Sequence, residues 1–300
     1  MNIYTIIVTY NAMQKQWIDR CLKSLENSTI QTTAIIIDND STDGTRDYVP
    51  TKYPTAIWLP QEKNLGFGQA NNVGIKWAME HNADYVLLLN QDAALHPKAI
   101  EYMLEESDSH SLLSPLHLNG DGSRIDKMFH SSLRNANNTM DDDLLIRHQL
   151  KDSYETGEIC AACWLLPRRL LEEIGGFNPL FFHYSEDSNY YHRTVYHKIK
   201  TILVPQAIMY HDRILQGNMQ AYNNKRIERD ILLPACNINL SFGQCVKEWL
   251  KVLYSCYAKE LPQHTYTPGT YILSVIHIIC KCKRILNSRK AEKGKGNTWL

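Results

Sequence analysis

Two acidic clusters are the residues of this 300-residue chain best suited to do chemistry. Asn90-Gln91-Asp92 directly follows an apolar run, and Asp92 could hold Mg²⁺ or Mn²⁺ beside a diphosphate because both ions prefer oxygen ligands. Glu186-Asp187 follows the aromatic segment 181–184, and a carboxylate in a partly dry pocket can have its pKa raised and act as a general base. Both clusters have a structural alternative: Asp92 could cap a helix before Pro97, and Glu186-Asp187 could complement a helix dipole.

His211 is a third candidate, because it ends an apolar run. A neutral imidazole could complete a metal shell with Asp92, although a single histidine is more often structural.

Two further patterns lack the residues that their chemistry requires. Gly66-Phe67-Gly68 lacks the third glycine of a dinucleotide loop, and Cys160 and Cys163 supply only half of a zinc site. The sequence therefore argues against a nicotinamide cofactor and against zinc.

Strands and helices alternate over the first 95 residues and would position these groups. Apolar runs predict strands at 3–9, 34–38, 56–59 and 85–89, and helical spacing predicts helices at about 14–27 and around 70–78. This alternation implies a mostly parallel sheet with helices on both faces, in which ligands bind outside the carboxyl ends of the strands. The polar residues expected at that edge are Tyr10, Asn11, residues 38–41 and residues 90–92.

The middle of the chain is less regular. Residues 119–143, rich in Asn, Asp and Ser, predict a surface excursion or mobile loop. Its acidic run 141–143 could bind a metal, although a solvated loop or a helix start is the simpler interpretation. A returning strand is expected within 157–166, helices at 167–175 and 186–196, and a final core strand at 201–204, after which residues 207–210 lead to His211.

The composition changes beyond about residue 225. Apolar helical stretches at 231–257 and 271–279 lead into a segment, 281–295, with seven Lys or Arg against one Glu. Such a segment can lie on an anionic membrane surface, or it can be a helix packed on the domain and followed by a solvated tail.

Charge and hydrophobicity exclude several classes of protein. Lys and Arg (32) balance Asp and Glu (32), and 44% of residues are hydrophobic, which argues against disorder and against a nucleic-acid partner. No apolar run is long enough to span a membrane, and residues 1–4 resemble a strand more than a signal peptide. The eight cysteines then suggest reduced thiols and a cytoplasmic protein, with the inner face of the plasma membrane as a peripheral location.

Several motifs together resemble the inverting family 2 glycosyltransferases, which have the GT-A fold, and in particular the rhamnosyltransferase-like members of the bacterial cell-envelope branch. The resemblance covers about residues 1–215. It is carried by the stretches 7–11, 37–44, 64–74 and 89–93, and by Gly175-Gly176-Phe177 followed by Glu186-Asp187.

The resemblance implies a role for each matching position. Thr9, Tyr10, Asn11, Asp38, Asn39 and Asn90 would bind the nucleotide. Asp92 and His211 would hold Mn²⁺ or Mg²⁺ at the donor diphosphate. Asp187 would deprotonate the acceptor hydroxyl and Glu186 would organise the pocket. The acceptor would meet Trp164, Gly176, Phe177 and Tyr184.

Asn90 and Asn39 depart from the family pattern, because many members have Asp at both positions. With Asn90, the metal has one anionic neighbour fewer. With Asn39, it is open which side chain contacts the nucleotide base.

The expected architecture is a GT-A domain over 1–225, with a nucleotide-sugar half (1–95) and an acceptor half (96–225), followed by a helical, basic extension (226–300). The expected function is transfer of a sugar from a UDP- or dTDP-donor, with dTDP-rhamnose as one candidate, to a glycan or lipid-linked acceptor. Two alternatives stay open. One is a binding or scaffold protein with a decayed metal site, and the other is a sugar-phosphate nucleotidyltransferase, for which the loop after the first strand lacks the Gly- and Arg-rich pattern.

Overall fold

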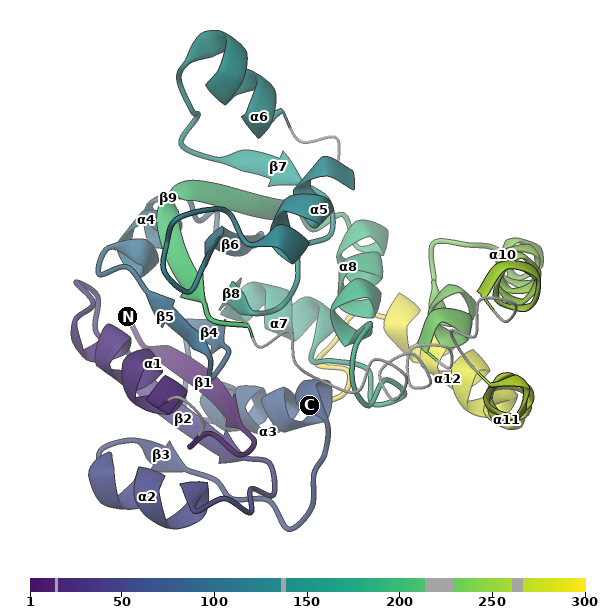
Figure 1. The fold of residues 1–300 in the computed structure, drawn as a ribbon, viewed down its shortest axis with the longest axis horizontal. Coiled ribbons are helices and arrows are strands. Elements are labelled where there is room, and N and C mark those ends of the chain that lie inside the picture. The colour runs from purple at the N-terminus through teal and green to yellow at the C-terminus, as the bar shows by residue number, and fades with distance from the viewer. Residues whose placement is uncertain (14–15, 136–138, 214–228, 261–266) are drawn as a thin grey trace.

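A computed structural model of the chain describes residues 1–13, 16–135, 139–213, 229–260 and 267–300. Its centre is one nine-stranded sheet with the order β3-β2-β1-β4-β8-β6-β9-β5, in which β7 pairs with β9 (Figure 1). The strands are β1 (Ile3–Thr9), β2 (Thr33–Asp38), β3 (Ile57–Trp58), β4 (Tyr85–Leu89), β5 (Ala93–Leu95), β6 (Leu112–Asn119), β7 (Tyr154–Thr156), β8 (Cys163–Pro167) and β9 (Thr201–His211).

The first four strands of the chain are parallel, as the alternation of strands and helices predicts. The returning strand expected within 157–166 begins only at Cys163, as β8, and residues 157–162 connect it to β7, which ends at Thr156. β8 runs antiparallel to β4. Residues just before β8 therefore lie at the same edge of the sheet as residues just after β4.

Helices cover both faces of the sheet. α1 (Trp17–Glu26), α2 (Thr45–Lys52) and α4 (Ala99–Glu105) pack on one face, and α3 (Phe67–Glu80), α7 (Arg168–Ile174) and α8 (Glu186–Tyr196) pack on the other. Neighbouring strand residues divide between the faces: Ile7 and Leu87 join the first cluster, whereas Ile6 and Leu88 join the second. This is the period of two that places successive side chains on opposite sides of a strand.

The segment 119–143 is more ordered than its composition predicts. It contains α5 (Lys127–Asn135) and the short helix α6 (Met140–Asp142), and Phe129, Leu133 and Met140 are buried in a cluster with side chains of β7 and β9. The prediction of a loop is wrong here because the apolar residues at helical spacing outweigh the polar ones.

The acidic run 141–143 is explained by ion pairs. Asp143 lies 2.9 Å from Arg147 and 3.3 Å from Lys151, and Asp141 lies 3.4 Å from His130. Within the described residues no group of three His, Cys, Asp or Glu side chains is arranged to hold a metal ion.

The C-terminal region is helical, as predicted, but the stretch 231–257 is not one helix. A helix at 229–236 ends before α10 (Phe242–Ser255), which is followed by the π-helical turn Cys256–Glu260, α11 (Pro268–Cys280) and α12 (Cys282–Lys293). Ser241 begins α10 with a capping box: its hydroxyl accepts a hydrogen bond from the Gln244 backbone at 3.4 Å, and Gln244 Oε1 accepts one from Ser241 N at 2.8 Å.

The basic segment 281–295 forms a packed helix, which was one of its two predicted alternatives. Ser288 and Glu292 of α12 are buried and accept hydrogen bonds from Asn178 Nδ2 at 2.7 and 2.8 Å. Residues 294–300 then return to α7, where Thr298 O accepts a hydrogen bond from Gly176 N at 2.9 Å. The domain boundary predicted at residue 225 lies outside the described residues. No helix in the described part of the chain is long and apolar enough to cross a membrane.

Candidate active site

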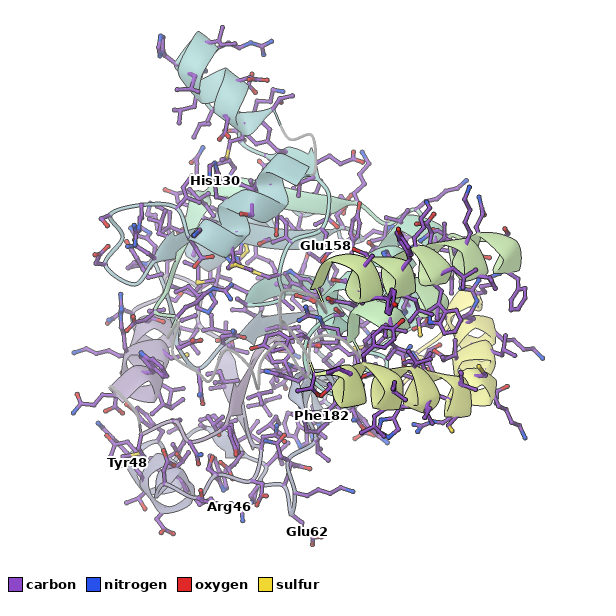
Figure 2. The ribbon with its side chains drawn as sticks, turned by 45° about the vertical axis from the view of Figure 1, so that its right-hand side comes forward. Arg46, Tyr48, Glu62, His130, Glu158 and Phe182 are labelled. Atoms are coloured by element: carbon purple, nitrogen blue, oxygen red, sulfur yellow. The ribbon has the colours of Figure 1, made fainter. Side chains whose placement is uncertain are left out.

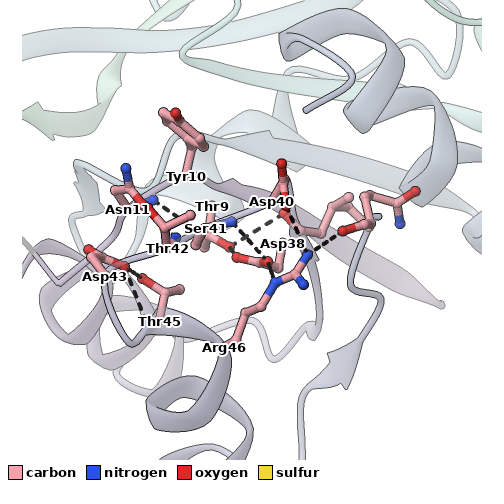
Figure 3. A network of polar contacts seen from close by, with 12 residues as sticks. Thr9, Tyr10, Asn11, Asp38, Asp40, Ser41, Thr42, Asp43, Thr45 and Arg46 are labelled. Atoms are coloured by element: carbon pink, nitrogen blue, oxygen red, sulfur yellow. Dashed lines mark hydrogen bonds and ion pairs between the residues drawn. The ribbon is translucent and has the colours of Figure 1, made fainter. Parts of the chain in front are cut away.

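A buried polar network joins the carboxyl ends of β1 and β2 (Figure 3). The Asp38 carboxylate has no exposed surface, and it accepts hydrogen bonds from Arg46 Nε at 2.7 Å, Ser41 N at 3.2 Å and Thr9 Oγ1 at 3.3 Å. Arg46 comes from α2 and also lies 3.7 Å from Asp40. Asp38 thus holds the loop between β2 and α2, and its contact with a nucleotide stays a prediction.

Asn11 and Asn39 order the neighbouring loops. Asn11 has a left-handed backbone (φ 51°), and its Oδ1 accepts a hydrogen bond from Thr42 N at 2.8 Å. Asn39 is buried, with Oδ1 accepting from Leu65 N at 2.7 Å and Nδ2 donating to Asn64 Oδ1 at 3.1 Å. An amide can donate and accept at once, so the Asn39 side chain satisfies both neighbours.

Tyr10 is the most open of the predicted nucleotide-binding residues. Its side chain is 50% exposed, while its backbone is fixed by Gln91, whose Oε1 accepts from Tyr10 N at 2.9 Å and whose Nε2 donates to Tyr10 O at 3.1 Å. An exposed aromatic ring on a fixed backbone at this edge can stack on a nucleotide base.

Asp92 and His211 meet at the carboxyl ends of β4 and β9. His211 Nε2 lies 3.3 Å from Asp92 Oδ1, because β5 pairs Ala93 with His211 in the register of the sheet. Asp92 is half-buried and His211 is buried. His211 Nδ1 and Asn90 Oδ1 are both buried without a hydrogen-bond partner.

Glu186 and Asp187 begin α8. The two preceding residues, Tyr184 (φ 69°) and Ser185 (φ 65°), are left-handed, which turns the chain sharply into the helix. Ser188 N donates to Asp187 Oδ1 at 2.9 Å, and the backbone of Ala161 donates a second hydrogen bond to this carboxylate. These two donors favour the ionised form of Asp187.

Burial acts on both carboxyls. It raises the pKa of Asp187 above its ordinary value, and the backbone donors of Asp187 oppose the shift. Burial, followed by the charge of Asp187, raises the pKa of Glu186 to about 8. A carboxyl whose pKa is raised by burial can serve as a general acid or base near neutral pH. Asp187, which two backbone donors hold in place, is the better oriented of the two carboxyls.

The segment 160–163 links the two carboxylate sites. Ala162 O accepts a hydrogen bond from Asn90 N at 2.9 Å, while Ala161 N donates to Asp187, and Cys163 pairs with Leu89 in the sheet. The antiparallel entry of β8 thus brings the acidic group after β4 and the acidic start of α8 to one edge of the sheet.

Two glycines at the start of α3 allow this helix to approach the loop before α8 and Glu186. Gly66 has φ 78°, and a Cβ on it would lie 1.8 Å from the Phe182 carbonyl oxygen; a Cβ on Gly68 would lie 3.4 Å from Glu186 Cβ. The stretch 64–74, which resembles the family in sequence, therefore positions the loop that leads to Glu186 and Asp187.

Residues 4–175 match the profile of a protein family described as Glycosyl transferase family 2. The chain belongs to this family. An N-acetylglucosaminyl-diphospho-decaprenol L-rhamnosyltransferase of Mycobacterium tuberculosis is 26% identical over 220 residues, which cover 65% of this chain and 72% of that relative. An undecaprenyl-phosphate mannosyltransferase of Micrococcus luteus is 27% identical over 108 residues, 35% of this chain and 44% of the relative. The chain is accordingly a glycosyltransferase.

Solved structures share its fold. S. aureus TarS 1-349 in complex with UDP superposes with a TM-score of 0.53 at 16% identity, covering 98% of this transferase and 90% of that chain. The mannosyltransferase PcManGT from Pyrobaculum calidifontis, in complex with GDP-Man and Mn²⁺, gives a TM-score of 0.57 at 13% identity, covering 97% and 86%. These likenesses confirm the predicted GT-A fold.

The donor chemistry of the site fits a divalent cation. Asp92 supplies a carboxylate oxygen, His211 a ring nitrogen, and Asn90 a buried amide oxygen that has no other partner. Mg²⁺ and Mn²⁺ are commonly bound by few protein oxygens together with substrate phosphates, which leaves room for a diphosphate to complete the shell.

Three of the four predicted acceptor residues of the transferase are packing residues. Trp164 and Phe177 lie in the second core cluster with their rings stacked at 6.0 Å, and Gly176 is buried against Thr298. They are buried and pack behind α8, so here they support the helix, and a contact with the acceptor stays a prediction for them. Tyr184 is exposed on the loop before α8 and keeps its proposed role.

Three residues at the site were not singled out from the sequence. Arg46 holds Asp38, Arg213 donates to Asp126 at 3.1 Å and to Cys160 Sγ at 3.4 Å, and Glu158 accepts a hydrogen bond from the Ser188 hydroxyl. Burial, and then the charge of Asp187, raises the pKa of Glu158. Arg213 could have been proposed from the sequence, because it lies two residues after the candidate ligand His211. The roles of Arg46 and Glu158 depend on tertiary contacts that the sequence does not show.

Proposed function

We propose that this transferase moves a sugar from a UDP- or dTDP-linked donor to a hydroxyl of a lipid-linked or polysaccharide acceptor, with inversion at the anomeric carbon. The names of the two curated relatives, which contain decaprenol and undecaprenyl phosphate, support a polyprenyl-linked acceptor. The rhamnosyltransferase relative supports dTDP-rhamnose as the first donor to test.

The observation that carries the proposal is the position of Asp187. Its half-buried carboxylate lies at the start of α8, accepts hydrogen bonds from Ser188 N at 2.9 Å and from the Ala161 backbone, and lies at the same sheet edge as Asp92. In a single displacement, Asp187 would take the proton of the acceptor hydroxyl as that oxygen attacks the anomeric carbon. The neutral Glu186 avoids a second negative charge beside the base.

The donor diphosphate would lie between Tyr10 and Asp92. Asp92, His211 and Asn90 would hold a divalent cation there, which when bound stabilises the negative charge that grows on the leaving diphosphate. Tyr10 would stack on the base, and the Asp38–Arg46 network would keep the surrounding loop in shape for it.

A thermal-shift screen tests the donor side. UDP-, dTDP- and GDP-sugars are each added with Mn²⁺ or with EDTA, to the wild type and to Asp92→Asn. A ligand that binds only the folded state raises the melting temperature. We expect a shift for a UDP- or dTDP-sugar that disappears with EDTA and in Asp92→Asn. A shift that is equal in EDTA would contradict the metal site, and a shift for GDP-sugars alone would contradict the donor class.

A further inference from the structure

The helices α10 and α11 carry apolar side chains on two opposite sides. On their inner sides, Trp249 and Leu253 of α10 and Val275 and Ile278 of α11 pack in a common cluster with Phe181. A helix of a soluble domain needs only this one apolar stripe. The outer sides therefore require a separate explanation.

The outer side of α10 is an exposed apolar stripe. Phe242, Val246, Leu250 and Tyr254 recur every four residues, which aligns them along one side of the helix, and they are 38–70% exposed. A shallow hollow runs along this stripe, and Lys247 lines it with the apolar residues.

The outer side of α11 repeats the pattern. Ile272, Ile276 and Ile279 are 48–56% exposed, and Leu273 is 58% exposed. Both helices lie at the end of the molecule opposite α1 along its longest axis (Figure 1), and they extend side by side away from the sheet (Figure 2). We call the exposed stripes of α10 and α11 together the outer apolar face.

Positive charge lies on the outer apolar face and continues into α12, which directly follows α11. In the segment 268–293, Lys283, Arg284, Lys290 and Lys293 are exposed, whereas the single acid of that segment, Glu292, is buried; Lys295 lies farther on and pairs with Glu173 of α7 at 2.8 Å. Lys247 and Lys251 line the hollow with Val246 and Leu250, and Lys251 pairs with Glu248 at 2.6 Å. Apolar side chains with cations around them match the acyl boundary and the headgroups of an anionic membrane.

We infer that the outer apolar face of α10 and α11, rather than the basic segment alone, docks the transferase on a membrane that contains anionic lipids. A second copy of the chain fits this face less well, because a two-fold contact would bring two positively charged faces together. The inference rests on the proposed polyprenyl-linked acceptor and deepens it. The inner sides of these helices pack on Phe181, in the loop that leads to Glu186, so docking would hold the acceptor side of the site near the bilayer.

Vesicle flotation of the full-length protein tests the inference. The vesicles contain phosphatidylcholine alone or with phosphatidylglycerol. The variants are Phe242→Ser/Leu250→Ser/Ile276→Ser in the outer apolar face, Lys290→Glu/Lys293→Glu in α12, and Leu145→Ser/Ile146→Ser as the control. The control residues are 73% exposed but lie in the π-helical turn Asp143–Arg147, away from this face.

We expect wild type and control to float with anionic vesicles only. The apolar variant should lose membrane binding, and the lysine variant should bind at least about 20-fold more weakly, since each cation near the surface contributes about a fivefold factor. Equal flotation of wild type and apolar variant, or no flotation of wild type, would overturn the inference. A wild-type dimer that the apolar variant converts to monomer, without vesicle binding, would assign the face to a second copy.

The donor-induced thermal shift separates this inference from the proposed function. It is measured without vesicles on the same variants, none of which alters the donor site, and it also shows that each variant is folded. Retained shift with lost flotation supports the docking face. Flotation of a protein that shows no donor shift and no transfer would leave docking in place and contradict the proposed function.

Discussion

Substitution of Gly66 by alanine should displace the start of α8 and with it the catalytic pair. Gly66 caps α3 with φ 78° and ψ 174°, a conformation that essentially only glycine adopts. The new Cβ would lie 1.8 Å from the Phe182 carbonyl oxygen, so an ordinary contact of 3.4 Å requires a movement of about 1.6 Å. The loop that must move leads directly to Glu186 and Asp187.

The size of the effect follows from two separate costs. The backbone conformation alone costs about 1–3 kcal/mol of stability. A misplacement of about 1 Å at a reacting group can reduce the rate by about 100-fold. We therefore expect kcat/KM of Gly66→Ala to fall by about 100-fold, in addition to a lower melting temperature.

Gly44→Ala is the matched control for backbone strain. Gly44 has φ 91° and caps α2, but a Cβ on it would meet nothing within 4 Å. Both variants are assayed for sugar transfer below their melting temperatures, with the folded fraction measured by circular dichroism. Gly44→Ala should lose stability and keep its kcat/KM. Equal kcat/KM for the two variants would refute the argument that the contact between Gly66 and Phe182 positions α8.

Two further predictions concern the buried charges. The pKa of Glu186 is raised from 4.5 to about 8 in the folded protein, so the folded state keeps a proton that the unfolded state releases, and the free energy of unfolding should fall as the pH rises between these values. Glu186→Gln should flatten that decline in thermal melts from pH 5 to 9; an unchanged slope would count against a protonated Glu186. Arg46→Met should cost about 1–3 kcal/mol in chemical denaturation, because it leaves a buried hydrogen-bond acceptor on Asp38 without its strongest donor, and a loss near zero would show that Arg46 is dispensable.

The sequence was sufficient to predict the start and end of those elements whose apolar pattern is strong. β1, β4 and α8 begin and end at the predicted residues, because short β-branched runs and a helical pattern with acidic residues at its start allow few other structures. The pattern could not give the direction of β8, since a buried strand is equally apolar in either direction. That direction is nevertheless what brings Ala161 and Ala162 between Asn90 and Asp187.

The site was predicted in part for a similar physical reason. Asp92 and His211 are adjacent because β5 and β9 pair, and their position at strand ends indicated as much. Trp164 was expected to contact the acceptor, but a large aromatic side chain can line a pocket or fill a core, and the sequence does not show that Phe177 and Tyr190 pack around it. The resemblance assigned Asp38 to the nucleotide, whereas its pairing with Arg46 depends on how α2 folds back and could not be predicted from the sequence.

The central claim is that Asp187 is the base that removes the acceptor proton. Its most direct test is Asp187→Asn, which keeps the size of the side chain and an oxygen for the backbone donors, but removes the proton acceptor. Single-turnover transfer should fall by about 10²- to 10⁴-fold, while the donor dissociation constant, measured by calorimetry in Mn²⁺, stays at the wild-type value. A transfer rate close to wild type, or a loss of donor affinity as large as the loss of rate, would contradict the account.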